Sequence, residues 1–398
     1  MSDVVSAIAN ASRSDWGRIV GALIRITGDW TLAEDATQDA FTTALTRWPV
    51  DGIPNNPAAW LTTTARNRAI DRLRSAASER ARAKEVSILD SLQSGEQDIE
   101  DDRLRLIFTC CHPALPMPAR VALTLRTVAG LTVPEIAAAF LVPETTMAQR
   151  LVRARRKIEE AGIPYRVPPA ELLGERLGGV LAVLYLVFNQ GYSSISRNEL
   201  SDSAVSMASA VATLMPAETE ARALLALLLL QNSRRDARVG AIGELLTLEE
   251  QDRSAWHHDE IVRGLALVTD AGSARASGPY AIQAAIAACH ARATSAADTD
   301  WTAIVALYDS LLELSPSPVI ELNRAIAIGM RDGPDAGLVI LDTLRLDGYR
   351  WLPAAQGDLL RRAGRTTEAG ARFREAIALA PDGPEREDLE RRLAELES

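Results

Sequence analysis

The stretch LTVPEIAAAFLVPETTMAQRLVRARRKIEE, residues 131–160, contains the clearest fold signal in the chain. Its first ten residues predict a short helix, residues 141–143 (Leu-Val-Pro) a turn, and residues 144–160 a longer helix. Two helices joined by a turn of three or four residues are typical of a helix-turn-helix. Ala137 has the small side chain that close helix crossing requires, although Leu141 occupies the usual glycine position of the turn.

The longer of these helices has two different faces. Apolar residues recur at intervals of four, three and four, which predicts a buried stripe formed by Met147, Leu151, Ala154 and Ile158. Short polar side chains near its beginning suit base edges in a major groove, and arginines suit phosphates or guanine. The predicted DNA-contacting residues are Thr145, Thr146, Gln149, Arg150, Arg153, Arg155 and Arg156. A solvated basic face without a partner is the alternative.

Charge is distributed unevenly along the 398 residues, whose formal net charge is −10. Residues 1–166 hold 21 Lys+Arg and 20 Asp+Glu, whereas residues 167–398 hold 22 and 33. An N-terminal part that is neutral overall but locally basic indicates nucleic-acid binding.

A second basic helix is expected at residues 58–75, with Pro57 near its first turn. Its mixture of cations, amides and an aromatic ring suits unpaired bases. The candidate contacts are Asn55, Asn56, Trp60, Arg66, Asn67, Arg68, Arg72 and Arg74. A core position for Trp60 is the alternative. The preceding helix is expected to begin with Thr31 as N-cap and Glu34 in a capping box, and to stop at Pro49.

Several classes of function are disfavoured by the sequence. The longest apolar runs are too short to span a membrane, and no secretory signal is apparent, so a cytoplasmic location is expected. The three cysteines form no disulfide framework, and Cys110, Cys111 and His112 lack the partners of a zinc site. Without a phosphate loop or a nucleophile–base pair, we expect no enzyme activity, no metal and no cofactor.

The C-terminal part contains a helical repeat. Gly357, Ala369, Phe373, Ala376 and Pro381 match positions 8, 20, 24, 27 and 32 of a 34-residue tetratricopeptide (TPR) unit. Residues 308–316 and 333–344 look like degraded copies. Because each helix pair leaves one face unburied, a stacked solenoid is expected.

These segments together resemble the extracytoplasmic-function (ECF) sigma factors of the sigma-70 family. Residues 32–48 and 56–75 are similar to region 2, and residues 119–158 are similar to region 4. The TPR-like tail, with LYLVFNQGYSS at 184–194, resembles that of one ECF subgroup. The implied fold is all-α. The implied divisions are region 2 at 1–78, an acidic linker at 79–102, region 4 at 103–165 and a TPR-like solenoid at 166–398.

The resemblance also implies roles for particular residues. Residues that match region 2.2 would dock on the clamp of the RNA polymerase β′ subunit: Glu34, Asp35, Gln38, Asp39 and Phe41. The loop at 49–57 and the helix through Arg74 would read and open the −10 element, and residues 145–156 would read the −35 element. Ala148 stands where many members have a basic residue, so no −35 sequence is inferred.

The implied function is promoter-specific transcription initiation by a sigma factor. Its implied partners are core RNA polymerase, through the β′ clamp and the β flap, and promoter DNA. The TPR-like tail would regulate or support activity through intramolecular or protein contacts. Two alternatives stay open: a helix-turn-helix regulator with a TPR sensor that is not a polymerase subunit, and a TPR scaffold whose N-terminal helices bind proteins.

Overall fold

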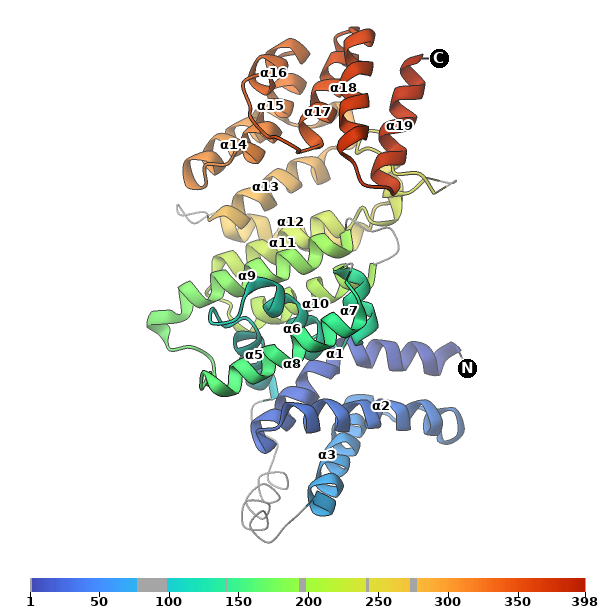
Figure 1. Cartoon of the computed structure of the whole chain (residues 1–398), viewed down its shortest axis with the longest axis vertical. Coiled ribbons are helices and arrows are strands. Elements are labelled where there is room, and N and C mark those ends of the chain that lie inside the picture. Colours follow the sequence, from blue (N-terminus) through green and yellow to red (C-terminus); the bar gives the residue numbers. More distant parts are fainter. Residues whose placement is uncertain are drawn as a thin grey trace. The chain divides into compact units, whose positions relative to one another are not determined.

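The computed structural model describes residues 2–76, 99–140, 142–192, 198–240, 243–272 and 278–397. In these ranges the chain is helical and contains no β-strand, apart from one isolated bridge between Val239 and Leu245. The all-α prediction is confirmed. The chain divides into two compact units, Met1–Pro216 and Ala217–Ser398, called the first and the second unit below (Figure 1).

The first unit contains α1 (Ser2–Thr27), α2 (Trp30–Asp51), α3 (Pro57–Ala76), α5 (Ile99–Cys110), α6 (Met117–Thr127), α7 (Val133–Ala139), α8 (Glu144–Glu160), α9 (Ala170–Tyr192) and α10 (Asn198–Leu214). Helices α1, α2 and α3 pack on one another, and α1 also packs on α5. Helices α6, α7 and α8 form a second group, in which α8 contacts both others. The predicted helix-turn-helix is therefore present as α7 and α8, while Leu141 lies outside the described residues.

Two expectations for α2 were wrong. The N-cap is Asp29, whose side chain accepts a hydrogen bond from the Leu32 amide at 2.9 Å, so Thr31 and Glu34 form no capping box. The helix also continues through Pro49 to Asp51. A proline this close to the end removes few hydrogen bonds, and the helix stops instead at Gly52, whose φ of 86° suits glycine.

Helices α9 and α10 belong to the first unit, although the sequence placed a domain boundary at residue 165. They pack on each other and contact α5, and α9 also contacts α6. The Arg176 guanidinium of α9 donates to the Phe108 carbonyl of α5 at 2.8 Å. Residues 79–98 of the predicted acidic linker at 79–102 lie outside the described residues, and its last four residues begin α5.

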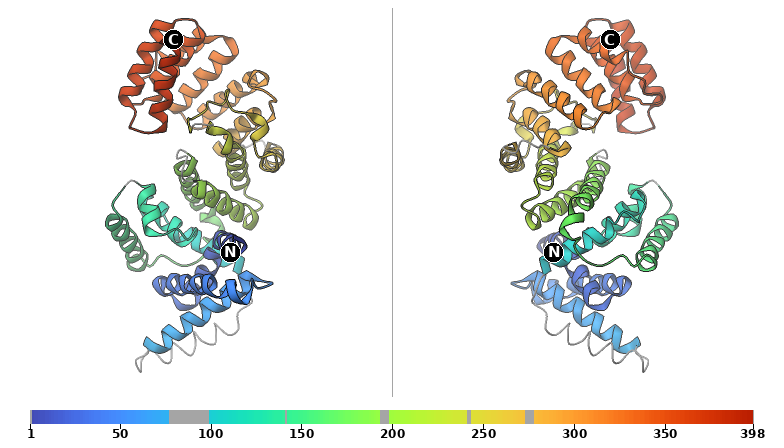
Figure 2. Two further views of the ribbon diagram at one scale, coloured as in Figure 1. Left: turned by 90° about the vertical axis from the view of Figure 1, so that its right-hand side faces the viewer. Right: turned by 90° about the vertical axis from the view of Figure 1, so that its left-hand side faces the viewer.

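The second unit contains α11 (Thr219–Asn232), η1 (Asp236–Arg238), η2 (Arg253–Ala255), α12 (His258–Gly272), α13 (Pro279–Arg292), η3 (Ala296–Asp298), α14 (Trp301–Leu314), α15 (Pro318–Asp332), α16 (Pro334–Leu341), α17 (Trp351–Arg362), α18 (Thr366–Leu379) and α19 (Pro384–Glu397). From α13 onward each helix packs on the next one in the chain, and the orange-to-red helices lie side by side in that order (Figures 1 and 2).

The TPR pattern residues lie where α17 and α18 pack together. Ala369, Phe373 and Ala376 are fully buried. A Cβ atom at Gly357 would come within 2.9 Å of the Phe373 ring, so the close approach of the two helices requires glycine there. Pro381 follows α18 and is exposed.

Among the described residues, no helix combines the length and apolar character that crossing a bilayer requires.

The position of α9 and α10 predicts how the chain tolerates truncation. A chain ending at Pro216 should keep the first unit folded and unfold cooperatively. A chain ending at Pro168 should aggregate, because it lacks α9, which contacts α5 and α6 and whose side chains Val180, Leu184, Val187 and Phe188 are buried. Thermal unfolding followed by circular dichroism, with size-exclusion chromatography, tests this. Equal melting temperatures of the two fragments would contradict it.

Candidate nucleic-acid interface

Helix α8 buries the apolar stripe that its spacing predicts. Met147, Leu151, Ala154 and Ile158 are all buried against the neighbouring helices. Helix α7 begins with a capping box that the sequence reading missed: Thr132 accepts from the Glu135 amide, and the Glu135 carboxylate accepts from the Thr132 amide at 2.6 Å. Thr-x-x-Glu at residues 132–135 was the available signal. These features hold α8 in place against α7.

The opposite face of α8 carries most of its predicted DNA contacts. Thr145, Gln149, Arg153 and Arg156 are exposed, and Thr146 is half-buried at the first turn. Arg150 is half-buried, with its guanidinium carbon 5.3 Å from the centroid of the Phe140 ring. The six residues thus lie together along one exposed side of a helix, which is the arrangement that groove recognition requires.

Arg155 differs from the other cations of α8 because it points into the first unit. Its Nη2 lies 2.7 Å from both carboxylate oxygens of Glu34 in α2. Only 20% of its side chain is exposed. In this conformation the Arg155 guanidinium pairs with Glu34 and is not available to an external ligand.

Glu34 is the centre of this internal contact. Its carboxylate is almost fully buried, with 3% of the side chain exposed, and Arg126 Nε of α6 donates to it at 3.0 Å. The Thr127 hydroxyl adds a bond at 3.2 Å. A buried carboxylate needs such donors because it has lost its hydration. The sequence reading missed Arg126 and Thr127, and placed Glu34 on an exposed surface.

Further contacts join α1 to the region around α5 and α6. The Tyr165 hydroxyl lies 2.9 Å from the Gly21 carbonyl and 3.1 Å from the Asp102 carbonyl. The buried carboxylate of Asp102 accepts from Arg25 Nε at 2.8 Å and from Arg105 Nη1 at 3.0 Å. Burial, followed by the charge of Asp102, raises the pKa of Tyr165. These bonds hold the N-terminal helices against α5, α6, α7 and α8, which are called the α5–α8 group below.

An aromatic contact completes the same interface. A Cβ atom at Gly130, which has a φ of 77°, would come within 2.7 Å of the Trp16 ring. The Trp16 ring in turn packs on the Phe41 ring with centroids 5.7 Å apart. Phe41, a predicted polymerase contact, is therefore buried.

The remaining acidic candidates of α2 stay at the surface. Gln38 is exposed, and Asp35 and Asp39 are half-exposed. Arg72 of α3 donates to Asp35 at 2.9 Å and to Asp39 at 2.7 Å. A residue predicted to bind the −10 element thus pairs with two predicted to bind polymerase.

Helix α3 presents the other basic surface. Asn67, Arg68 and Arg74 are exposed, and Arg66 is half-buried. Asn55 and Asn56 are exposed in the preceding loop, where the side-chain Oδ1 of Asn56 also caps α3 by accepting from the Ala59 amide at 3.0 Å.

Trp60 is half-buried at the beginning of α3. Its ring makes an edge contact with the ring of Trp48, and the two centroids lie 5.6 Å apart. Trp60 therefore packs against Trp48 while part of its side chain remains accessible to solvent. Two exposed apolar residues nearby, Val50 and Ile53, were not singled out from the sequence, and 83% of Val50 is exposed.

The Cys110–Cys111 pair lies at the end of α5 in the core. Cys111 Sγ is 3.5 Å from the Thr124 hydroxyl. Burial raises the pKa of Cys111 to about 11 and raises that of Cys110 as well. Both thiols are therefore protonated at neutral pH and act as small apolar core groups.

Three family models match the chain. Residues 16–79 match sigma-70 region 2, residues 105–158 match sigma-70 region 4, and residues 176–272 match a family of unknown function (DUF6596). The last match extends from α9 in the first unit to α12 in the second.

Two relatives are similar over different lengths. The uncharacterized protein R00370 of Rhizobium meliloti is 45% identical over 381 residues, which cover 92% of this chain and 90% of that protein. The probable ECF RNA polymerase sigma factor SigI of Mycobacterium tuberculosis is 31% identical over 176 residues, which cover 42% of this chain and 59% of that protein. No solved structure matches the chain.

The buried position of Glu34 predicts a large effect on stability. Glu34→Gln and Arg126→Gln should each lower the free energy of unfolding of the first unit by about 3 kcal/mol. The first leaves Arg126 and Arg155 without their carboxylate, and the second leaves the buried Glu34 with one of its two guanidinium partners. Urea unfolding measures this. The matched control is Arg72→Gln, which removes a surface pair and should cost less than about 1 kcal/mol. Equal losses for Arg126→Gln and the control would contradict the central role of Glu34.

Proposed function

Because the chain belongs to the same family as the uncharacterized protein R00370 of Rhizobium meliloti and carries sigma-70 regions 2 and 4, we propose that it is a sigma factor. It binds core RNA polymerase and directs initiation at a restricted set of promoters. One observation carries the proposal: both sigma regions occur in order, and each contributes an exposed basic helix in a chain of net charge −10. Exposed basic helices of this kind are suited to binding a polyanion such as a nucleic acid.

The proposed −35 contacts lie on α8. Thr145, Thr146 and Gln149 at its beginning would reach base edges, and Arg150, Arg153 and Arg156 would bind phosphate or guanine. Their position on the exposed side of α8 supports this assignment. Arg155 joins them only if it leaves Glu34.

The proposed −10 contacts lie on the loop before α3 and on α3 itself. Amide and cationic side chains there suit an opened strand, whose bases can stack and accept hydrogen bonds. The proposed residues are Asn55, Asn56, Trp60, Arg66, Asn67, Arg68, Arg72 and Arg74. Exposed Val50 and Ile53 lie close by in the chain and suit contact with an unstacked base.

Polymerase docking is proposed for the exposed side of α2. Asp35, Gln38 and Asp39 are accessible there and suit the β′ clamp. Glu34 and Phe41, which the family resemblance also assigns to docking, face inward in this structure. Their participation requires that the α6–α8 group first move away.

We infer from this that the described conformation is a closed one. The −10 and −35 elements are separate sites on one promoter, whereas α2 and α8 are joined here through Glu34 and Arg155. Simultaneous contact with both elements therefore requires the α1–α3 group and the α5–α8 group to separate. A binding-competent state that is only partly populated lowers apparent affinity in proportion to its population.

The second unit is proposed to support or regulate initiation. Its sequential helix packing and the buried α17–α18 pattern support a TPR-like solenoid. Covalent attachment gives it a high effective concentration near the sigma regions. The chain that ends at Pro216 also tests this role, because unchanged transcription relative to the whole chain would contradict it.

Run-off transcription with purified core polymerase tests the proposed function. Adding the protein should produce promoter-directed transcripts. Arg153→Ala should reduce them roughly tenfold at limiting protein, since a base or phosphate contact contributes about 1–3 kcal/mol. Arg166→Ala is the matched control, because Arg166 is exposed but lies beyond α8. Promoter binding without added transcription would instead favour the helix-turn-helix regulator.

The closed conformation makes a separate prediction. Arg126→Gln weakens the contact to Glu34 without altering a proposed DNA-binding residue, so it should raise the affinity for core polymerase severalfold. Fluorescence anisotropy with labelled protein measures the affinity. Small-angle X-ray scattering of the free variant should show an increased radius of gyration. An unchanged or weakened affinity would contradict closure by this contact.

A further inference from the structure

The second unit contains a cleft of about 560 Å³. Its walls come from α14, α15, α17 and α19, together with the segment 247–253, which is called the strap below. This volume lies within the range of roughly 300–1,000 Å³ that is usual for small-molecule sites. Nothing in the sigma role uses it.

One side of the cleft is apolar and aromatic. Trp301 of α14, Ile326 and Met330 of α15, and Trp351 of α17 line it. Ile326 and Met330 are only partly buried, so their side chains offer surface to an occupant. A predominantly apolar wall with a few polar groups is typical of a pocket that encloses most of its ligand.

The other side is basic, although the unit as a whole is acidic. Residues 217–398 hold 20 Lys+Arg and 29 Asp+Glu. Nevertheless four arginines line this single cleft, against two carboxylates, those of Glu249 and Asp358. The arginines are Arg253, Arg361, Arg362 and Arg392. The local excess of positive charge indicates an anionic occupant.

The four arginines differ in the number and closeness of their ion-pair partners. Arg392 is held by Asp358 at 2.8 Å and by Asp388 at 2.6 Å. The nearest ion-pair contact of Arg361 with a described carboxylate is the 3.8 Å one to Asp358. Arg253 donates from Nη1 to the carbonyl oxygens of His290 and Ala293 at 2.6 and 2.7 Å. Arg361 and Arg362, which are adjacent at the end of α17, therefore have the fewest polar partners outside the strap.

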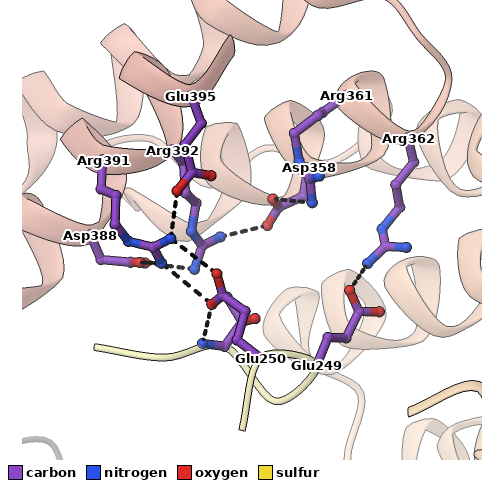
Figure 3. Close-up of polar contacts among 10 residues, drawn as sticks. Glu249, Glu250, Asp358, Arg361, Arg362, Asp388, Arg391, Arg392 and Glu395 are labelled. Carbon is purple, nitrogen blue, oxygen red and sulfur yellow. Dashed lines mark hydrogen bonds and ion pairs between the residues drawn. The ribbon is translucent and has the colours of Figure 1, made fainter. Parts of the chain in front are cut away.

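The strap already places a carboxylate on this site. Glu249 pairs with Arg362, and the adjacent Glu250 pairs with Arg391 at 3.0 Å (Figure 3). Although burial opposes it, bonds from Arg391 and Thr247 hold the pKa of Glu250 at about 2. Glu250 thus fixes the strap, while Glu249 makes a single pair from a side chain that is 41% exposed.

We propose that the cleft binds a small amphipathic organic anion. Its aliphatic or aromatic body packs on Trp301, Ile326, Met330 and Trp351, and its carboxylate or phosphate binds the guanidinium groups of Arg361 and Arg362. Arginine suits this role because its planar fork bonds two oxygens at once. The ligand anion replaces Glu249 on Arg362, while Glu250 keeps the strap as one wall.

Isothermal titration calorimetry on the whole chain tests the proposal with three defined probes: 2-naphthoate, decanoate and decyl phosphate. At least one should bind, and the matching neutral amide or alcohol should bind at least about tenfold more weakly, because a charge-assisted hydrogen bond contributes more than a neutral one. Arg361→Gln/Arg362→Gln should reduce the affinity at least about tenfold. Met330→Trp, which fills the cleft, should abolish binding.

One further variant separates ligand binding from a purely structural role of the cleft, through the direction in which it changes the affinity for the probe. Glu249→Gln should raise the affinity severalfold, because it removes the competing carboxylate from Arg362. Arg372→Gln/Arg374→Gln is the matched control, since it removes two arginines of α18 that lie outside the cleft lining, and it should leave the affinity unchanged. Circular dichroism confirms folding of each variant. No binding of any probe by the folded chain, or equal binding of the neutral analogues, would overturn the proposal.

Discussion

The arrangement of the first unit depends on one buried carboxylate. Glu34 lies on the inner side of α2 among Trp30, Ala33, Thr37 and Phe41, where an ionised group without partners would be strongly destabilising. Its compensation comes from far along the chain, from Arg126 and Arg155. In this conformation the buried carboxylate therefore couples the packing of the N-terminal helices to that of α6 and α8.

This constraint also divides the cations of α8. Arg155 stabilises the contact between the groups, whereas Arg153 and Arg156 stay at the surface. The same helix thus has an internal and an external electrostatic role. Any process that lets Arg155 act outside the unit must first supply Glu34 with other donors or with water, which is a natural reason for binding and opening to occur together.

The orientation of many side chains in α2 and α8 was predictable from the helical spacing of apolar residues. The apolar stripe of α8 followed directly from its four, three and four spacing. Arg155 lies four residues after Leu151, at the edge of that stripe, so its inward direction was also accessible. Glu34 likewise falls between buried positions of α2. What spacing alone does not reveal is which distant arginine meets which carboxylate, because ion pairs between helices depend on tertiary packing.

The division between the two units lies after Pro216, not at residue 165 as the family resemblance implied. The change from neutral to acidic sequence near residue 166 does not mark it, because net charge describes solvent-facing residues and says little about packing. The apolar run at 178–188 supplies most of the buried side chains of α9. Its packing partners, α5 and α6, depend on shape complementarity that a single apolar run does not encode.

A sequence in which nearly every cation is arginine makes functional assignment especially dependent on structure. Two of the 43 cationic residues, Lys84 and Lys157, are lysine. Arginine serves equally in internal carboxylate pairs and in phosphate recognition. In the first unit Arg25, Arg72, Arg105, Arg126 and Arg155 pair with described carboxylates. Arg68, Arg74 and Arg153 make no ion pair with a described carboxylate and remain exposed. The positive charge available to a nucleic acid is what remains after internal pairing, and these three arginines supply part of it on α3 and α8.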